Sequence, residues 1–371
     1  MDRSALILDL GSESTKAGFA GDVDPKCVIP TITGEYRVKN AEVGQGGYHR
    51  LLVGDEALHK SGLLTFYNPV ENGVIKDWER AEGFLKYCFS NELKVASEEH
   101  NVIMSEVPFQ SPADREKLAQ LMFETFNVSG FYLANLGLLS VQGSGRQSGI
   151  FCESGAHMTH TIPVSDGVVI TSAIQRAEFG GKDINELMIK LLSDKGYSFT
   201  TTAERLNARQ LKEKYCIVAQ DYESALEDNE EKYYETPDGT AINFSNERYK
   251  GAEAIFKPND LCGRGVDSIQ DMIMKSIEGS DEGVRANLFG TIVLSGGNTL
   301  FEGIRDRLQK EIESRAGDPG IVRVIADDSR KYGVFNGASI LASSSMMDTM
   351  WIQREEYAES GASIVQTKCP Q

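Results

Sequence analysis

The chain has 371 residues and carries 38 Lys and Arg side chains against 55 Asp and Glu, which gives a formal net charge of −17. Its composition is 40% hydrophobic and 25% charged, as in ordinary globular proteins. Because a single core stops growing near roughly 250–300 residues, we expect two or more packed domains. The negative charge repels nucleic-acid phosphates and anionic lipid, which argues against non-specific binding to either and leaves basic protein partners open.

The sequence disfavours membrane insertion and disulfide chemistry. No apolar run approaches the roughly 18 residues of a membrane span, and the run after Ser4 is too short for a secretion signal. The six cysteines stand singly, without zinc or redox spacing: Cys27, Cys88, Cys152, Cys216, Cys262 and Cys369. We expect a soluble cytoplasmic protein, with the nucleus also possible, that has reduced thiols and neither a membrane nor a direct nucleic-acid partner.

Short strands alternate with helical patterns along the chain. Residues 6–8 and 102–104 read as strands, and Ser111 is the expected cap of a helix with Pro112 in its first turn. Apolar residues then follow at helical spacing: Leu118, Leu121, Met122 and Phe126. This alternation predicts α/β layers. Residues 6–19 and 149–164 share one pattern, apolar strand, acid, glycine turn and second strand, which favours internal duplication unless the two are merely similar hairpins.

The first hairpin has the residue types of a phosphate site. In the sequence DLGSESTK, from Asp9 to Lys16, a tight turn of small residues would let backbone N–H groups face an anion. Lys16 would add a positive charge, and Asp9 could hold Mg²⁺ through water. The alternative is an ordinary hairpin turn with a surface lysine.

The second hairpin could supply the other half of a phosphate clamp. Its turn reads Glu153, Ser154, Gly155, Ala156 and His157, and Glu153 would face the same metal. No metal-ligand spacing supports the histidines as ligands. We therefore expect a turn residue at 157 and a satisfied core histidine at 160.

A third segment reads as strand, glycine turn and helix. Residues 291–294 form the expected strand and 295–298 the turn, while Thr299 and Glu302 have the spacing of a capping box. Such a turn at the carboxyl end of a sheet suits a nucleotide, although a plain strand-to-helix connection has the same pattern. The sequence lacks the signatures of a P-loop, a serine-hydrolase elbow and a zincin helix.

These three segments occur in the order that marks the actin, sugar-kinase and heat-shock ATPase superfamily, and the chain resembles the actin family over essentially its full length. The matching stretches are KAGFAGD at 16–22, VGDEA at 53–57, NELKVASEEH at 91–100, MFETFN at 122–127, GYSFTTTAER at 196–205, PDG at 237–239, VLSGGNTLF at 293–301, SILASSS at 339–345 and ESGASIVQTKC at 359–369.

The resemblance implies an α/β, two-lobed fold with duplicated domains around a nucleotide cleft. It places residues 1–136 and 333–371 in an outer, small lobe that carries a filament-contact loop near 35–50, and residues 137–332 in an inner, large lobe. The implied ligand is ATP or ADP with Mg²⁺ or Ca²⁺, and Asp9 would orient the metal's water. The residues matched to phosphate and nucleoside contacts are Gly11, Ser12, Lys16, Gly155, Arg209, Lys212, Glu213, Gly297, Asn298 and Lys331.

Departures from the family pattern concentrate in the region that hydrolyses ATP. Leu136 stands where the family has the glutamine that positions the attacking water. Where the family reads Asp-Ser-Gly-Asp-Gly, this chain has Glu153, Ala156 and His157, and His160 lies in the same region. We expect at most a slow ATPase. In addition, Glu13 replaces a glycine in the first hairpin and opposes phosphate binding unless it turns outward.

Partner surfaces depart as well. The acidic amino-terminal tail of the family is missing, and Glu42 lies in the filament-contact loop where the family is more apolar. We expect a nucleotide-binding cytoskeletal subunit that assembles with itself or with conventional actin and that contacts profilin-type or cofilin-type proteins. The alternative is a non-hydrolysing actin-related subunit of a complex of the dynactin, chromatin-remodelling or capping type. A small-molecule kinase of the same superfamily is disfavoured.

Overall fold

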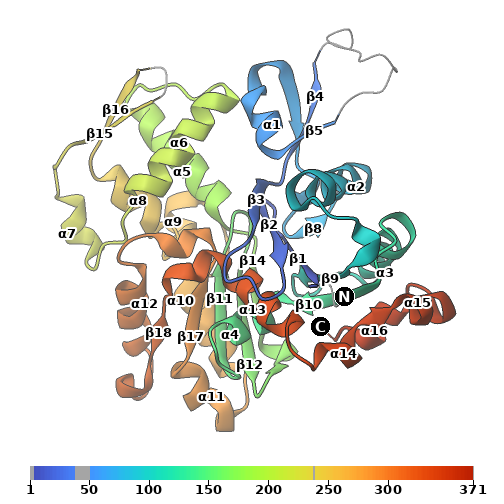
Figure 1. The fold of residues 1–371 in the computed structure, drawn as a ribbon. Coiled ribbons are helices and arrows are strands. Elements are labelled where there is room, and N and C mark those ends of the chain that lie inside the picture. Colours follow the sequence, from blue (N-terminus) through green and yellow to red (C-terminus); the bar gives the residue numbers. More distant parts are fainter. Residues whose placement is uncertain (1–3, 38–50, 237–238, 371) are drawn as a thin grey trace. The chain divides into compact units, whose positions relative to one another are not determined.

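The computed structural model describes residues 4–37, 51–236 and 239–370. The chain divides into two compact units: unit 1 comprises Met1–Gln147 and Tyr332–Gln371, and unit 2 comprises Ser148–Lys331 (Figure 1). The chain therefore passes from unit 1 to unit 2 after Gln147, whereas the resemblance placed this passage after Leu136. Within the described part of the chain, no helix combines the length and the apolar character that crossing a membrane requires.

The main sheet of unit 1 has six strands in the order β19-β10-β9-β1-β2-β3. β1, β2 and β3 are antiparallel neighbours, whereas β1, β9 and β10 run parallel. The strands are β1 Leu6–Leu10, β2 Ser14–Phe19, β3 Cys27–Pro30, β9 Asn101–Glu106, β10 Gly130–Asn135 and β19 Ile352–Gln353. The smaller pieces of sheet are β4 Thr33–Tyr36, β5 Leu52–Val53, β6 Leu64–Tyr67, β7 Val70–Glu71 and β8 Val74–Ile75.

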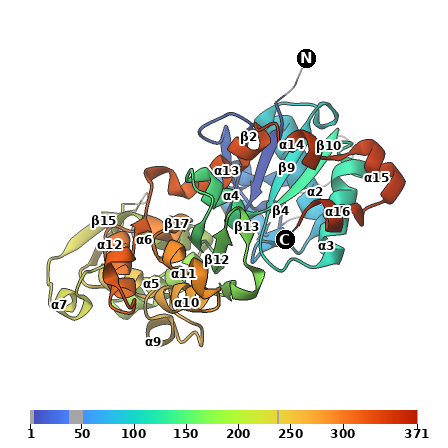
Figure 2. The same cartoon turned by 90° about the horizontal axis from the view of Figure 1, so that it is seen from below.

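The helices of unit 1 come from both ends of the chain. α3 (Pro112–Gln120) begins where the sequence predicts, because the Ser111 hydroxyl accepts a hydrogen bond from the Asp114 N–H. α16 (Ile364–Lys368), from the end of the chain, packs beside α3 (Figure 2). The other helices are α1 Gly54–His59, α2 Trp78–Tyr87, α4 Leu136–Gly143, α13 Gly333–Ala342, α14 Met347–Met350 and α15 Arg354–Ser360.

A crossing of α4 and α13 joins the two chain segments of unit 1. At Gly337 an added Cβ would stand 1.7 Å from the Leu139 carbonyl oxygen, so only glycine fits this contact. Gly143 makes the reciprocal approach, because its Cβ would stand 2.7 Å from the Gly333 carbonyl oxygen. This packing keeps α4 in unit 1, which explains why the chain passes to unit 2 only after Gln147.

The sheet of unit 2 repeats the arrangement of unit 1. Its order is β13-β12-β11-β17-β18, with β14 also paired to β12. Again an antiparallel hairpin, β11–β12, continues into parallel neighbours, β17 and β18. This repetition is what duplicated domains predict. The strands are β11 Gly149–Ser154, β12 Thr159–Ser165, β13 Val168–Val169, β14 Gln175–Ala177, β17 Ile292–Ser295 and β18 Val324–Ile325.

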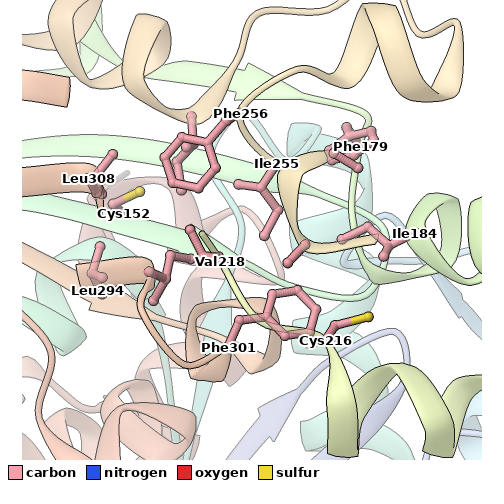
Figure 3. Close-up of a cluster of buried hydrophobic side chains, with 14 of the residues drawn as sticks. Cys152, Phe179, Ile184, Cys216, Val218, Ile255, Phe256, Leu294, Phe301 and Leu308 are labelled. Carbon is pink, nitrogen blue, oxygen red and sulfur yellow. The ribbon is translucent and has the colours of Figure 1, made fainter. Parts of the chain in front are cut away.

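Helices of unit 2 pack around one large hydrophobic cluster (Figure 3). Cys152 and Leu294 contribute to it from the sheet, and Ile184 and Leu308 contribute from α5 and α12. A two-stranded ribbon, β15 Lys232–Glu235 and β16 Ala241–Phe244, contacts α6, because the Tyr234 hydroxyl donates to Gln210 Oε1 at 2.7 Å. The helices are α5 Gly181–Asp194, α6 Thr202–Tyr215, α7 Tyr222–Leu226, α8 Glu247–Glu253, α9 Pro258–Cys262, α10 Ile269–Glu278, α11 Glu282–Phe289 and α12 Ile304–Glu313.

Candidate functional site

In unit 1, the first hairpin holds Asp9 and Lys16 directly opposite each other. Asp9 is the last residue but one of β1, and Lys16 faces it from β2, with 3.3 Å between Lys16 Nζ and Asp9 Oδ2. The Ser105 hydroxyl on β9 donates to the other carboxylate oxygen, Asp9 Oδ1, at 2.8 Å. Both side chains of the ion pair are about 15% exposed, at 16% and 14%. The carboxylate is therefore oriented from two sides and keeps a solvent-facing edge.

The turn of this hairpin is braced from a second loop. The backbone N–H of Gly73 donates to the Ser12 hydroxyl at 2.9 Å, and the Gly11 N–H closes onto the Asp9 carbonyl at 3.2 Å. Glu13 is half-buried, and its carbonyl accepts from the Thr31 N–H. In the bond from Gly73 the Ser12 hydroxyl is the acceptor. Its own proton can therefore still be donated to an anion.

In unit 2, the second hairpin tip is pinned to the start of α5. The Gly155 N–H donates to the Met158 carbonyl at 2.9 Å, which closes the turn on itself. The carbonyls of Gly155 and Ala156 accept from the N–H groups of Gly181 and Lys182, at 3.0 and 2.8 Å. The Gly155 N–H is thus already used within the turn, so an anion held here would rely on the neighbouring N–H groups.

Asn298 and Lys212 complete this tip from two further elements. The Asn298 amide donates to the Ser154 hydroxyl at 3.0 Å and to the Gly155 carbonyl at 2.7 Å. Lys212 Nζ, on α6, donates to the Gly181 carbonyl at 3.3 Å. Both side chains are 5% exposed. The structure therefore brings Gly155, Asn298 and Lys212 together as one buried polar network, as expected for residues of a single site.

The third segment departs from the sequence prediction at its helix. Thr299 does not cap α12, which begins at Ile304 after Gly303 in the left-handed region at φ 81°. Instead, the Thr299 hydroxyl donates to the Gly296 carbonyl at 2.7 Å within a short 3₁₀ turn, Gly297–Leu300. The capping box with Glu302 is also wrong. The Glu302 carbonyl accepts from the Val218 N–H, which commits this backbone to a bridge with a neighbouring segment.

The residues after β17 form a compact turn with room beside it. Gly296 has φ +86°, and an added Cβ would stand 2.5 Å from the Ser154 carbonyl oxygen. By contrast, no atom of the described chain lies within 4 Å of the position that a Cβ at Gly297 would take. The Arg330 carbonyl accepts from the Ser295 hydroxyl at 3.1 Å, which ties the segment carrying Lys331 to this turn.

The remaining predicted nucleoside contacts lie on α6. Arg209 Nε donates to Glu213 Oε1 at 2.7 Å, one helical turn away, and these side chains are 31% and 52% exposed. An exposed pair of this kind contributes little to stability, roughly 0.3–0.5 kcal/mol.

His160 differs from the satisfied core histidine that the sequence predicts. It is 1% exposed, and among the described residues neither ring nitrogen has a hydrogen-bond partner. Its Nδ1 lies 3.7 Å from Glu153 Oε2, which is longer than a hydrogen bond. A buried polar ring without a partner carries a desolvation cost, which a bridging water would relieve.

No preformed metal cage exists in the described residues, since no three His, Cys, Asp or Glu side chains come together there. Mg²⁺ commonly keeps several waters and takes one or two carboxylates together with phosphate oxygens. Asp9 and Glu153 each present one partly exposed carboxylate of this kind, at 14% and 24%. Each carboxylate, on its own hairpin, therefore has the chemistry to orient water on a hydrated cation.

Comparison with known protein families matches residues 1–370 to the actin family. The chain belongs to the actin family. Members of this family generally bind a nucleotide together with a divalent metal. The duplicated sheets and the two glycine-containing hairpins are thus the framework of an actin-family fold.

At the position where the resemblance implies a water-positioning glutamine, the side chain is apolar and buried. Leu136 is the first residue of α4 and is 5% exposed. The Asn135 side chain caps this helix by accepting from the Gly137 N–H at 2.9 Å. The local backbone around Leu136 is therefore that of a well-formed helix start.

Three supporting residues escaped the sequence analysis, namely Ser105, Gly73 and Gly181. Each acts through a hydrogen bond that joins segments distant in sequence, and no local pattern signals such a bond. The filament-contact loop near 35–50 lies mostly outside the described residues, and Glu42 falls among those outside. The prediction for that loop therefore stays a prediction.

Proposed function

We propose that this actin-family chain is a cytoskeletal structural subunit that binds ATP or ADP with Mg²⁺ or Ca²⁺ and hydrolyses ATP slowly. Family membership and the buried network around Asn298 support nucleotide binding. The observation that carries the slow hydrolysis is Leu136, a buried apolar side chain where the family has a glutamine that positions water.

The chain's own residues divide the work of binding. Lys16 and the Ser12 hydroxyl would meet phosphate oxygens, while Asp9 and Glu153 would orient water on the cation. The cation, when bound, neutralises charge on the phosphates. Lys212 and Asn298 hold the tip of the second hairpin in place. Arg209 and Glu213 lie close to Lys212 on α6, where they would contact the nucleoside.

Hydrolysis additionally needs a water held in line with the γ-phosphate and a group that accepts its proton. Leu136 can neither donate nor accept a hydrogen bond, and Ala156 supplies no carboxylate. Glu153, His157 and His160 are the titratable side chains that remain in this region. The loss of positioned groups of this kind typically lowers a rate by about 10²–10⁴-fold.

Single-turnover release of γ-labelled phosphate tests the hydrolysis proposal. We expect release far slower than from polymerised conventional actin, and partial recovery in the double variant Leu136→Gln with Ala156→Asp. Either change alone should restore little, because both groups act on one water. Leu138→Gln, two residues along the same helix, is the matched control and should restore nothing. Release as fast as that of conventional actin contradicts the proposal.

Nucleotide binding has its own test, because slow turnover and absent binding are different properties. A ligand that binds only the folded chain adds about 2.7 kcal/mol to the free energy of unfolding at 100 times Kd. The thermal midpoint rises as a result. We expect such a rise with Mg-ATP and a smaller one for Lys16→Met. An unchanged midpoint at large excess of ATP favours the alternative, a non-hydrolysing actin-related subunit of a larger complex.

Assembly is the second half of the proposal. We propose filaments or copolymers with conventional actin in the cytoplasm, with profilin-type and cofilin-type proteins as partners. Negative-stain microscopy of the chain in Mg-ATP and salt, alone and with conventional actin, separates a filament former, a copolymer and a monomeric subunit. Glu42→Met should lower the critical concentration if the carboxylate in the contact loop limits assembly, because an unpaired carboxylate is costly to bury.

A further inference from the structure

The turn between β7 and β8 contains a residue, Asn72, that the proposed function does not use. The two strands pair up to Glu71 and Val74, so the hairpin loop consists of two residues, Asn72 and Gly73. Both have positive φ, 53° for Asn72 and 73° for Gly73, as in a type I′ turn. Glycine is required at 73, because an added Cβ would stand 2.3 Å from Val107 Cγ1.

An Asn-Gly pair is the dipeptide most prone to deamidation. In this reaction the nitrogen of the following residue attacks the asparagine side-chain carbonyl carbon, and glycine has no side chain to obstruct the approach. The Asn72 side chain is partly exposed and, among the described residues, has no hydrogen-bond partner that would hold its amide away. The pair at 72–73 therefore combines the reactive residue types with access to water.

The reaction proceeds in two steps. In the first, the Gly73 nitrogen loses its proton to solvent base and bonds to Asn72 Cγ, while the side-chain nitrogen takes up a proton and leaves as ammonia. The product is a cyclic imide, a succinimide. In the second step, water opens this ring. Cleavage between the nitrogen and Cγ gives aspartate, whereas cleavage between the nitrogen and the main-chain carbonyl carbon gives isoaspartate. Overall, one water is consumed and one ammonia is released.

A second Asn-Gly pair in the chain has a different environment. Asn336 and Gly337 lie inside α13, where backbone N–H groups bond to carbonyls one turn earlier. Gly337 is also pressed against Leu139, whose carbonyl oxygen would stand 1.7 Å from an added Cβ. Attack by the Gly337 nitrogen therefore requires α13 to open, whereas attack at the turn requires only a local rearrangement.

The Gly73 nitrogen that reacts is also the one that braces the first hairpin. Its N–H donates to the Ser12 hydroxyl at 2.9 Å. The succinimide has no hydrogen on this nitrogen, and isoaspartate adds one backbone carbon before Gly73. The close approach of Val107 blocks movement of Gly73 in that direction, so the longer backbone must displace the N–H from Ser12.

We propose that Asn72 is a deamidation site and that its conversion to isoaspartate releases the first hairpin from its brace at Gly73. The inference goes beyond the proposed function and does not rest on it, because neither step involves a nucleotide. In the unmodified chain, the hydrogen bond to Ser12 holds the proton that the first step must remove, so the brace slows its own loss.

Peptide mapping of the folded full chain, kept at mildly alkaline pH without nucleotide, tests the site. Trypsin releases the two pairs on separate peptides, 61–76 and 332–354, and the other asparagine of 61–76, Asn68, precedes a proline that has no N–H to react. We expect deamidation in 61–76, with isoaspartate labelled by an isoaspartyl methyltransferase, and a reaction roughly tenfold slower or more in 332–354. In urea the two rates should converge. Equal rates in the folded chain, or no reaction in its 61–76, would overturn the assignment of Asn72.

Variants and hydrogen exchange test the brace. Ser12→Ala removes the acceptor, and we expect deamidation at Asn72 to become about two- to twelvefold faster. Ser14→Ala is the matched control, because Ser14 lies in the same hairpin and its hydroxyl does not accept from Gly73. Residues 70–75 should exchange faster in the aged chain, purified by anion exchange, than in Asn72→Asp, which adds the same charge without the extra backbone carbon. An unchanged rate in Ser12→Ala, or equal exchange in the aged chain and Asn72→Asp, would overturn the release of the brace.

Discussion

Asn298 shows how one side chain can organise a site made from separate elements. Its amide joins the turn after β17 to both Ser154 and Gly155 on the second hairpin. At the same time Gly155 accepts from the start of α5, so three elements meet at two adjacent residues. The orientation of the hairpin tip therefore depends on a buried amide whose donors are both used.

We expect Asn298→Ala to lower the free energy of unfolding by about 1–3 kcal/mol, because it leaves a buried hydroxyl and a buried carbonyl short of a donor. Asn298→Asp should cost at least as much, since an oxygen would then face the Gly155 carbonyl now 2.7 Å away. Both variants should also weaken ATP binding. Urea unfolding and nucleotide titration measure the two effects, and a neutral Asn298→Asp would contradict this account.

Glu106 and Arg115 form a buried ion pair in unit 1 that bears on pH dependence. Arg115 Nε lies 2.9 Å from Glu106 Oε2, and the two side chains are 2% and 1% exposed. Arg115 also donates to the Cys369 carbonyl and to Gln366, so the pair reaches the end of the chain. Burial raises the pKa of Glu106 to about 7, while the charge of Arg115 acts in the opposite direction.

This raised pKa predicts a particular slope of stability with pH. A carboxyl with a higher pKa in the folded chain binds more protons there, so folding loses stability as pH rises from about 4.5 to about 7. We expect wild type to lose stability relative to Glu106→Gln across that window, and the difference to level off above pH 8. Urea unfolding of both proteins from pH 5 to 9 measures this loss and its levelling off. If wild type instead gained stability relative to Glu106→Gln as the pH rises, the charge of Arg115 would outweigh the effect of burial on the pKa of Glu106.

Among the elements, the crossing of α4 and α13 tolerates the least change. The two helices approach through Gly143 and Gly337, so their backbones touch where other helix pairs interpose side chains. Gly337→Ala should cost about 3 kcal/mol or more, because a Cβ would overlap the Leu139 carbonyl and the backbone must move.

Gly283→Ala is the matched control for this prediction. Gly283 lies in α11, and no atom of the described chain is within 4 Å of its would-be Cβ. Alanine should therefore stabilise unit 2 slightly, by up to about 1 kcal/mol, through helix propensity alone. Thermal midpoints of the two variants provide the comparison. Similar values would show that the helices separate easily at Gly337.

The elements also show where sequence patterns suffice and where they fail. The Ser111 cap and the two glycine hairpins follow from local residue types, and the structure has them where the sequence predicts. The Thr299 cap fails because a distant segment at Val218 engages the Glu302 backbone. His160 is buried as predicted, but its ring nitrogens have no hydrogen-bond partner among the described residues. Its nearest acid, Glu153, lies across the hairpin at 3.7 Å, a distance that residue spacing in the sequence does not predict.

On the scale of the whole molecule, the two units have different covalent status. Unit 2 is one uninterrupted segment, Ser148–Lys331, with its own sheet and hydrophobic cluster. Unit 1 is assembled from both ends of the chain, and its sheet includes β19 on the outer side of β10. A fragment that folds as unit 2 therefore needs one chain segment, whereas unit 1 needs two segments together.

We expect the fragment 148–331 to fold alone and to unfold cooperatively in urea with native near-ultraviolet circular dichroism. The fragment 1–147 should not, because it lacks α13 against α4 and β19 against β10. Adding the peptide 332–371 in trans should restore part of its signal. A cooperative transition in 1–147 alone would contradict this division of the chain.

The split of unit 1 has a consequence for how the chain is made. A ribosome delivers β1, β9 and β10 early, yet the strand and helices that complete their sheet are encoded after residue 331. At roughly 5–20 residues per second, translation of 148–331 takes on the order of 10–40 s, during which the nascent amino-terminal part exposes apolar surface. Arg115 receives its last partners, Gln366 and the Cys369 carbonyl, only after all of unit 2 has been made. Unit 1 can therefore finish folding only after unit 2, although its first strands are the first to leave the ribosome.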